Sequence, residues 1–256
     1  MWKEYTLKDL NTMTKDEVIY NVQLCDVVYK DQKDIDFKEL GLTSVKWIDD
    51  KKTDTQAFVA MKGKSLYVVF RGTSSKKDAQ NDASIDKVPF INEGDKVHIG
   101  FKSSWDAVKE IVLKNIYKVS GQYDKIVVCG HSLGAAVATL CAYNISHVYD
   151  TVPVECCTIG SPRVGNKTFK NNYDSRKIKT LRIVHNNDLV TRSPNIGYYH
   201  VNHMLRIDYE GNIKKYMIDW ERAWNYIKSV VTGKTIKDHM TASYIGSLKK
   251  WYDKQP

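Results

Sequence analysis

A serine flanked by glycines is the part of the chain whose residue types and spacing best suit chemistry, in the pentapeptide GHSLG at residues 130–134. The apolar, β-branched run at residues 126–129 precedes it and an alanine-rich stretch follows, so the pattern predicts a strand, a sharp turn and a helix. Glycines two residues before and after Ser132 remove the side chains that would collide with the neighbouring strand and helix. We therefore expect the Ser132 hydroxyl to stand above a sheet, where it could act as a nucleophile.

A nucleophilic serine also needs amide donors that stabilise the oxyanion of a tetrahedral intermediate. The Leu133 amide opens the expected helix, where N–H groups have no intrahelical acceptor and the helix dipole favours negative charge. A second amide should come from the turn after an earlier strand, and Thr73 follows the apolar run at residues 64–70 in the sequence FRGT. Taken alone, FRGT is equally compatible with a plain turn. With the serine motif, it predicts an oxyanion hole made by Thr73 and Leu133.

The serine must be deprotonated by a base, and a buried acid must hold that base in one tautomer. Asp188 directly follows an apolar strand pattern at residues 180–185, and catalytic groups in α/β folds lie where strands end. An aspartate at this position could instead cap the loop through backbone N–H groups. The chain order serine, aspartate, histidine favours Asp188 as the acid.

The base is less well specified, because four histidines follow Ser132 in the chain: His185, His200, His203 and His239. His185 precedes Asp188, which is the wrong order, and His200 and His203 lie at the entrance to an expected strand. His239 comes late, between a turn signal and an amphipathic stretch. Chain order favours His239 as the base and leaves His203 and His200 as alternatives, and for each of them a surface or core role is also open.

The remaining patterns alternate between strands and helices, which indicates an α/β fold. A capping box at residues 14–17 predicts a helix to about residue 30. Strands are expected at residues 45–50, 56–61, 64–70, 97–101, 154–159 and 180–185, and a hairpin at 204–209 and 213–218. Helices are expected at residues 103–120, after Ser132, and near 220–231, with an amphipathic stretch at 238–252.

Length and composition predict a single globular domain over residues 1–256, because 42% of the residues are hydrophobic and no linker or internal repeat interrupts the chain. The first ten residues lack an apolar signal core, and no apolar run is long enough to span a membrane. The five cysteines are odd in number and stand mostly in apolar runs, which predicts buried thiols. These features together predict a soluble protein in the reducing cytoplasm.

The chain carries 39 Lys and Arg against 30 Asp and Glu, a formal net charge of +9. Such a charge could draw the protein to an anionic membrane surface. The lysines are scattered, however, which favours an ordinary solvated surface, and the basic and aromatic stripe typical of nucleic-acid binding is missing. The spacing of Cys, His and Asp matches no zinc or calcium motif, so we expect neither a metal nor a cofactor. The oligomeric state is not specified.

Six segments in the same order resemble the class 3 lipases, the type known from filamentous fungi: LYVVFRGT, VHIGF, VVCGHSLGAAVATL, TIGSPRVGN, RIVHNNDLVTRSP and a late Asp-His. The resemblance implies an α/β-hydrolase fold, with a central, mostly parallel sheet flanked by helices, and hydrolysis of lipid esters without a cofactor. It also implies Ser132 as the nucleophile, Asp188 as the acid and His239 as the base, with oxyanion amides from Thr73 and Leu133. The sequence HMTASY at 239–244 is similar to the His-Leu-Ser-Tyr context of the family, but stretched.

The segment after FRGT departs from the family, whose lipases carry an apolar, often Trp-bearing lid helix there. Here it reads SSKKDAQNDASIDKVPF, without an aromatic residue before Phe90. A polar lid has little apolar area to bury in a lipid interface, so we expect weak interfacial activation. Short-chain esters, monoacylglycerols and phospholipids are then as plausible as triacylglycerol. Two alternatives stay open: a phospholipase acting on anionic membrane lipids, and a lipase-like binding protein without activity, although the latter has no need for a serine, an aspartate and a late histidine.

Overall fold

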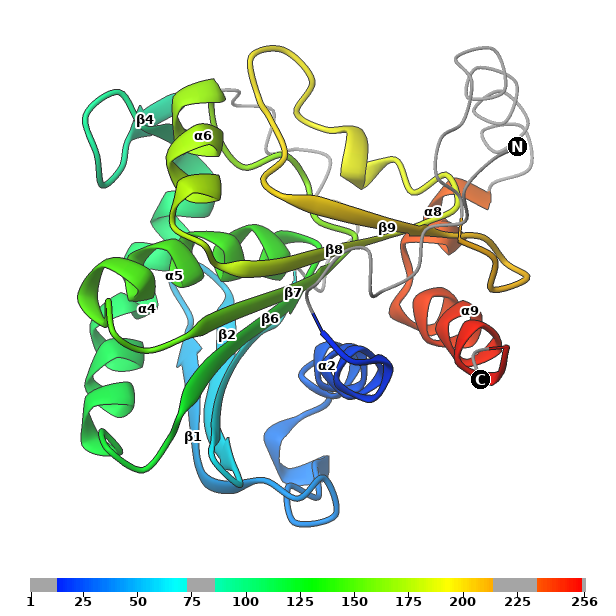
Figure 1. Ribbon diagram of the computed structural model, residues 1–256, viewed down its shortest axis with the longest axis horizontal. Helices are drawn as coiled ribbons and strands as arrows, with labels where there is room; N and C mark the ends of the chain where they lie inside the picture. Colours follow the sequence, from blue (N-terminus) through cyan, green and yellow to red (C-terminus); the bar gives the residue numbers. More distant parts are fainter. Residues whose placement is uncertain (1–12, 73–85, 214–233, 255–256) are drawn as a thin grey trace.

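The computed structural model describes residues 13–72, 86–213 and 234–254. A seven-stranded sheet in the order β1-β2-β3-β6-β7-β8-β9 forms its centre (Figure 1). The strands are β1 (Thr43–Asp50), β2 (Thr55–Lys62), β3 (Ser65–Phe70), β6 (Lys125–His131), β7 (Val154–Ile159), β8 (Lys179–His185) and β9 (His203–Ile207). The first two pairings are antiparallel and the other four are parallel. The predicted mostly parallel sheet is thus confirmed, and the carboxyl ends of five strands meet at one edge.

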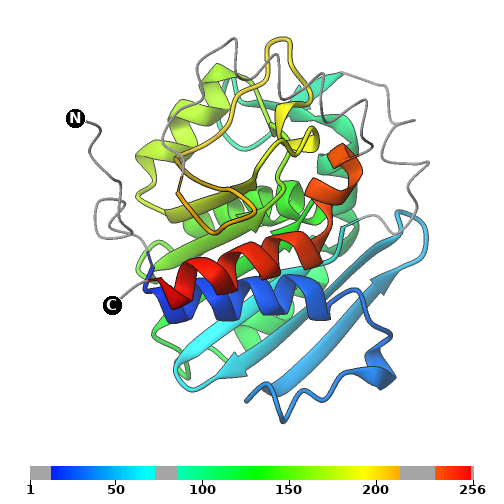
Figure 2. The same cartoon turned by 90° about the vertical axis from the view of Figure 1, so that its right-hand side faces the viewer.

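Helices cover both faces of this sheet (Figure 1). One face packs against α4 (Ile99–Lys118), α5 (Leu133–Val148) and α6 (Lys167–Ser175). The other face packs against α2 (Lys15–Val27) and α9 (Thr241–Asp253), which lie side by side in Figure 2. The first and last helices of the described chain therefore form one layer on this face of the sheet.

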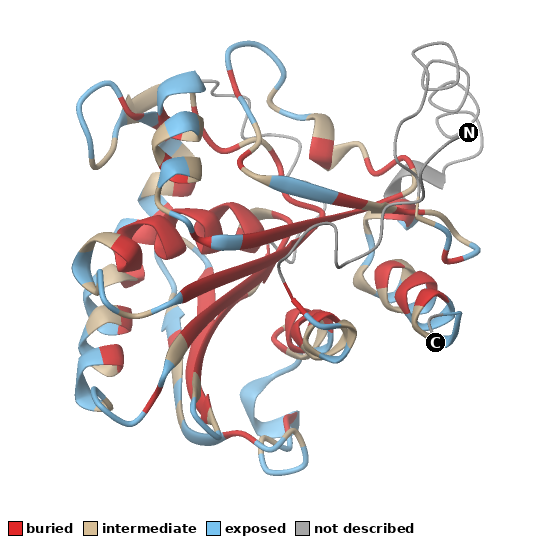
Figure 3. Ribbon diagram, viewed as in Figure 1, coloured by how far each residue is buried: buried red, intermediate tan, exposed pale blue. Residues whose placement is uncertain are grey.

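The strand β6 shows why the central sequence is apolar without alternation. Ile126 and Val128 belong to the core under α4 and α5, whereas Val127 and Cys129 belong to the core under α2 and α9. Successive side chains of a strand point to opposite faces, so a strand covered on both sides is apolar at every position. Figure 3 shows the central strands buried along their length.

The segment before α4 differs from the expected strand at 97–101 and helix from 103. A short strand β5 (Lys96–His98) pairs with β4 (Lys87–Pro89), and α4 already begins at Ile99. The reason is a cap that periodicity does not reveal: His98 Nδ1 accepts a hydrogen bond of 3.1 Å from the Gly100 amide.

The C-terminal region also differs from its prediction, because the amphipathic stretch expected at 238–252 is interrupted at Met240. Helix α8 (Lys234–His239) ends before Met240, whose extended backbone interrupts the pattern, and α9 follows. The expected hairpin is represented by β9 and an isolated bridge between Ile207 and Ile213. The remainder of the hairpin and the expected helix at 220–231 lie outside the described residues.

The cysteines behave as the sequence predicts, because all five are buried free thiols. Within the described ranges, no helix combines the length and apolar character needed to cross a bilayer. Two short 3₁₀ helices, η1 (Gln32–Asp34) and η2 (Val190–Arg192), complete the described elements.

Candidate active site

Ser132 stands in the turn between the end of β6 and the start of α5, with φ 58° and ψ −127°. A positive φ is strained for a non-glycine residue, so the surrounding backbone must hold it. A Cβ on Gly130 would lie 2.3 Å from the Gly134 carbonyl oxygen, and a Cβ on Gly134 would lie 2.5 Å from that of Phe70. The turn is therefore possible only with glycine at both positions.

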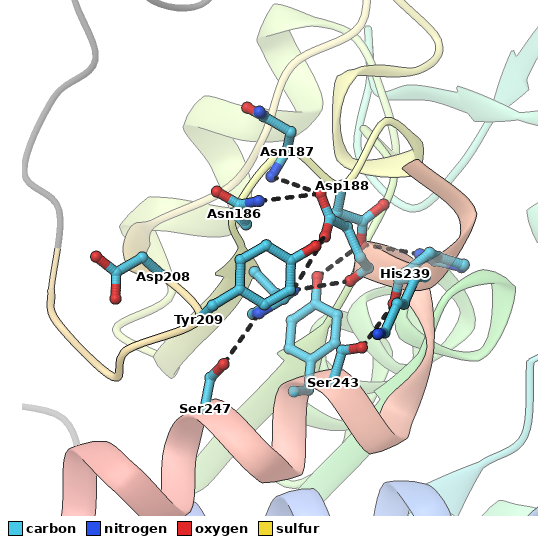
Figure 4. Close-up of polar contacts among 12 residues, drawn as sticks. Asn186, Asn187, Asp188, Asp208, Tyr209, His239, Ser243 and Ser247 are labelled. Atoms are coloured by element: carbon cyan, nitrogen blue, oxygen red, sulfur yellow. Dashed lines mark hydrogen bonds and ion pairs between the residues drawn. The ribbon is translucent and has the colours of Figure 1, made fainter. Parts of the chain in front are cut away.

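The structure brings Ser132, His239 and Asp188 together in one chain of hydrogen bonds. The distance between Ser132 Oγ and His239 Nε2 is 2.8 Å. The distance between His239 Nδ1 and Asp188 Oδ2, two residues labelled in Figure 4, is also 2.8 Å. A carboxylate only accepts, so Nδ1 carries the proton and Nε2 is free to accept from the serine hydroxyl. This arrangement can activate the serine as a nucleophile.

Asp188 is buried and accepts two further hydrogen bonds. The Tyr244 hydroxyl donates to Oδ2 at 2.6 Å, and the Val190 amide donates to Oδ1 at 3.0 Å. Burial acts to raise the pKa of this carboxyl, but the hydrogen bonds from His239 and Tyr244 outweigh it and hold the pKa below its usual value. Asp188 is therefore ionised at neutral pH and able to stabilise a protonated His239.

A second histidine, His131, is hydrogen-bonded to the backbone of His239. Its Nε2 donates to the His239 backbone carbonyl at 2.7 Å, and its Nδ1 accepts from the Tyr29 hydroxyl at 2.7 Å. Burial, and then the proximity of His239, lower the pKa of His131 to about 3, so it is neutral at physiological pH. His131 thus holds the main chain of His239 without adding a charge next to it.

Sequence reasoning missed several of these supporting residues. Gly160 directly follows β7 and has φ +62°, and a Cβ there would lie 3.0 Å from both Asp188 Oδ2 and His239 Nδ1. In the sequence, Gly160 is marked only by its place directly after a buried strand. Tyr29 carries no signal, because it lies 102 residues from His131 in the chain.

The other candidate histidines have different partners. His185 is buried between the Asp238 carbonyl and Ser247. His200 Nε2 donates to the Thr191 carbonyl at 2.7 Å, and burial lowers its pKa to about 2. His203 is exposed at the start of β9. Of the four histidines considered, the structure therefore joins His239 to Ser132.

The predicted oxyanion hole is described in part. Leu133 is the first residue of α5, where the expected free amide lies. A Cβ on Gly72 would lie 2.6 Å from the His131 carbonyl oxygen and 3.0 Å from Ser132 Cβ, so Gly72 packs directly against the turn at Ser132. Thr73 itself lies outside the described residues, and its role stays a prediction.

A mostly parallel sheet with a serine turn after a central strand, and with Asp and His at the same edge, defines the class of α/β-hydrolases. The family model described as lipase (class 3) matches residues 67–198, which is more than half of the chain. The chain belongs to the class 3 lipase family, as the sequence motifs predict.

Two relatives illustrate the similarity. A lipase of Rhizopus niveus is 34% identical over 177 residues, covering 60% of this chain and 44% of the relative. The secreted mono- and diacylglycerol lipase A of Penicillium camembertii is 35% identical over 162 residues, covering 60% and 52%. The chain thus spans about half the length of the curated relatives it matches.

Solved structures agree with this relationship. The native Rhizomucor miehei lipase propeptide complex superposes with a TM-score of 0.71 at 27% identity, covering 80% of this chain and 70% of that one. A triacylglycerol lipase, whose catalytic centre is described as a serine protease triad, gives a TM-score of 0.73 at 28% identity, covering 82% and 85%.

The comparison overturns the predicted cytoplasmic location, because the Penicillium camembertii relative is a secreted enzyme. The inference from cysteines was wrong for a physical reason. Buried free thiols show that the cysteines serve as small apolar side chains in this core. They do not report the compartment in which the protein resides.

Proposed function

We propose that this chain is a serine carboxylester hydrolase that acts on lipid esters, with residues 1–256 forming one catalytic domain. The observation that carries the proposal is the pair of 2.8 Å contacts that His239 makes with Ser132 and Asp188. Ser132, Asp188 and His239 come from separate elements that converge on the carboxyl ends of the parallel strands. The lipase names of the relatives support lipid esters as the substrate class.

The mechanism follows from the proton positions. His239 takes the Ser132 proton as Oγ attacks the ester carbonyl carbon, and ionised Asp188 stabilises the imidazolium that forms. The amides of Leu133 and Thr73 are proposed to hold the oxyanion. His239 then gives its proton to the leaving alcohol oxygen, which leaves an acyl group on Ser132. Water, deprotonated by His239, attacks this acyl-enzyme and releases the acid.

We propose partial glycerides and short-chain esters as substrates alongside triacylglycerol. The polar composition of residues 74–89 supports this choice, because a polar covering segment offers little area to an oil interface. The Penicillium camembertii relative, named for mono- and diacylglycerols, points the same way.

A second candidate is hydrolysis of anionic phospholipids at a membrane surface. An Arabidopsis thaliana relative named phospholipase A(1) DAD1 is 34% identical over 114 residues, covering 41% of this chain and 26% of that protein, and the net charge of +9 would favour an anionic surface. Fatty acid release from anionic vesicles that exceeds release from neutral vesicles, and falls at high salt, would support this candidate.

The test of the main proposal is hydrolysis of a p-nitrophenyl ester series from short to long acyl chains, with Ser132→Ala as the control. Activity that disappears in the variant is expected, and the preferred chain length separates an esterase from a lipase. A folded wild-type protein without activity on any ester would instead indicate a lipase-like binding protein.

A further inference from the structure

A second buried carboxylate lies next to the triad in sequence and in space. Asp238, the residue before His239, is 0% exposed. Its Oδ2 accepts hydrogen bonds of 3.2 Å from the Asn187 amide and 3.2 Å from Asn186 Nδ2, and its Oδ1 accepts from the Tyr209 hydroxyl. Figure 4 labels these three donors. The proposed chemistry uses none of these groups, although burying a charge is costly unless hydrogen bonds compensate it.

The position of this carboxylate links the two segments that carry the acid and the base. Asn187 directly precedes Asp188, and Asp238 directly precedes His239, so one hydrogen bond joins chain segments 51 residues apart. Asn186 has a positive φ of 41°, which is tolerated by asparagine, and its side chain holds the turn to Asp238. The Asp238 carboxylate therefore fixes how the Asp188 turn sits against the end of α8.

The backbone of Asp238 is held as well. His185 Nδ1 donates to the Asp238 carbonyl at 3.1 Å, and His185 Nε2 accepts from the Ser247 hydroxyl at 3.0 Å. Burial lowers the pKa of His185, which is therefore neutral at physiological pH. Since no imidazolium balances the Asp238 carboxylate, the three hydrogen bonds from Asn186, Asn187 and Tyr209 must stabilise it.

We propose that Asp238 is a positioning residue, whose buried carboxylate clamps the Asp188 turn to the His239 segment and so sets the geometry of the triad. The proposal rests on the function proposed above. It predicts that loss of the clamp slows the chemical step, because a displacement of about 1 Å at reacting groups costs on the order of 100-fold in rate.

The chain contains a matched control for a purely structural role. Asp95, 1% exposed, also accepts from one backbone amide, one side-chain amide and one tyrosine hydroxyl. Its donors are Asn92 at 3.1 Å, Asn172 at 2.8 Å and Tyr143 at 3.1 Å. They belong to the β4–β5 turn, α6 and α5. Ser132 caps α5, but Tyr143 lies 11 residues further along that helix, and the Asp95 contacts reach neither Asp188 nor His239.

The experiment compares steady-state hydrolysis of a p-nitrophenyl ester by the wild type, Asp238→Ala and Asp95→Ala. For Asp238→Ala we expect kcat to fall about 10- to 100-fold while KM changes less than about threefold. For Asp95→Ala we expect kcat within about twofold of wild type, although thermal unfolding shows a comparable loss of stability. Equal kcat values for two folded variants would overturn the proposal.

The conservative variant Asp238→Asn separates hydrogen bonding from charge and covers the case in which Asp238→Ala does not fold. The asparagine oxygen can accept from Asn186 and Asn187, and its NH₂ can donate to the Tyr209 oxygen. We expect this variant to retain kcat within about fivefold of wild type, a small loss because all three contacts can be kept. A loss as large as about 100-fold would overturn positioning by hydrogen bonds.

A spectroscopic readout distinguishes this proposal from the proposed function. The proton shared by His239 Nδ1 and Asp188 should give a far-downfield ¹H NMR signal, assigned by its absence in His239→Ala. We expect the signal to shift or broaden in Asp238→Ala and to persist in Asp95→Ala. An inactive wild type would defeat the proposed function alone, whereas an unchanged signal in Asp238→Ala would defeat the clamp alone.

Discussion

The proposed nucleophile and the proposed base of this site are held in place by different means. Ser132 is positioned by its own stretch of chain, since β6, the glycine turn and α5 are contiguous. His239 stands at the end of a six-residue helix, and its contacts with Asp188 and His131 lie 51 and 108 residues away in the chain. One group is fixed by backbone geometry, and the other by side-chain hydrogen bonds from several elements.

This difference implies two patterns of sensitivity to substitution. In the serine turn, one added methyl group meets backbone atoms that cannot move independently, so few positions should have large effects. Around the histidine, each hydrogen bond contributes separately, so several positions should have moderate effects. The following experiments test this contrast, in order of expected effect.

Removal of either reacting group should have the largest effect. Ser132→Ala and His239→Ala should each reduce kcat/KM by about 10⁴-fold or more, and the double variant should be no worse than the more damaging single variant, because the two act as a unit. Ester hydrolysis under steady-state conditions measures this. Losses that multiply in the double variant would show that the two residues act independently.

Alteration of the serine turn should come second. Gly134→Ala places a Cβ 2.5 Å from the Phe70 carbonyl oxygen, so we expect about 1–3 kcal/mol loss of stability and about 100-fold loss of kcat as Ser132 is displaced. The control is Gly246→Ala in α9, where nothing lies within 4 Å. It should gain about 0.5–1 kcal/mol in urea unfolding and leave kcat unchanged. Wild-type activity in Gly134→Ala would contradict the claim that backbone geometry fixes the position of Ser132.

Removal of one hydrogen bond at the acid should have a moderate effect. Tyr244→Phe deletes the 2.6 Å donor to Asp188, and we expect kcat to fall about 3- to 10-fold, the equivalent of about 1 kcal/mol. Tyr20→Phe is the control, because its hydroxyl donates to the Leu40 carbonyl, outside the site. A loss of kcat near 10⁴-fold in Tyr244→Phe would mean that a single contact determines activity around the histidine, as it does in the serine turn.

The last experiment measures stability instead of activity, and concerns its dependence on pH. The pKa of His131 is about 3 in the folded protein and 6.5 without burial, so the unfolded chain takes up the proton first as pH falls. This group should lower the unfolding free energy by up to about 1.4 kcal/mol per pH unit from about pH 6.5 to 3. In His131→Gln, urea unfolding should show a shallower decline, and both curves should run parallel above pH 7. Identical slopes below pH 6 would contradict a buried neutral His131.

The same contrast explains what could be predicted from the sequence. Apolar runs, glycine spacing and one capping box are local signals, and they predicted alternating strands and helices and the turn at Ser132. The mostly parallel sheet was implied by the resemblance to the class 3 lipases. Asp188 and His239 could be selected as candidates by chain order and by resemblance, which left His200 and His203 open at first. The structure brings Asp188 and His239 to the serine.

The contacts that surround the base could not be predicted, because they join distant parts of the chain. No periodicity relates Tyr29 to His131, or Asp238 to the amide of Asn187. The break between α8 and α9 at Met240 was also missed, since the amphipathic pattern at 238–252 runs across it. These features depend on tertiary packing that local patterns do not contain.

The most direct test of the proposed nucleophile is covalent labelling with a fluorophosphonate, followed by intact-mass measurement and peptide mapping. The account predicts one label per chain, on the peptide that contains Ser132, and no label in folded Ser132→Ala. A wild-type protein that is folded and remains unlabelled, or a label that persists in Ser132→Ala, would contradict it.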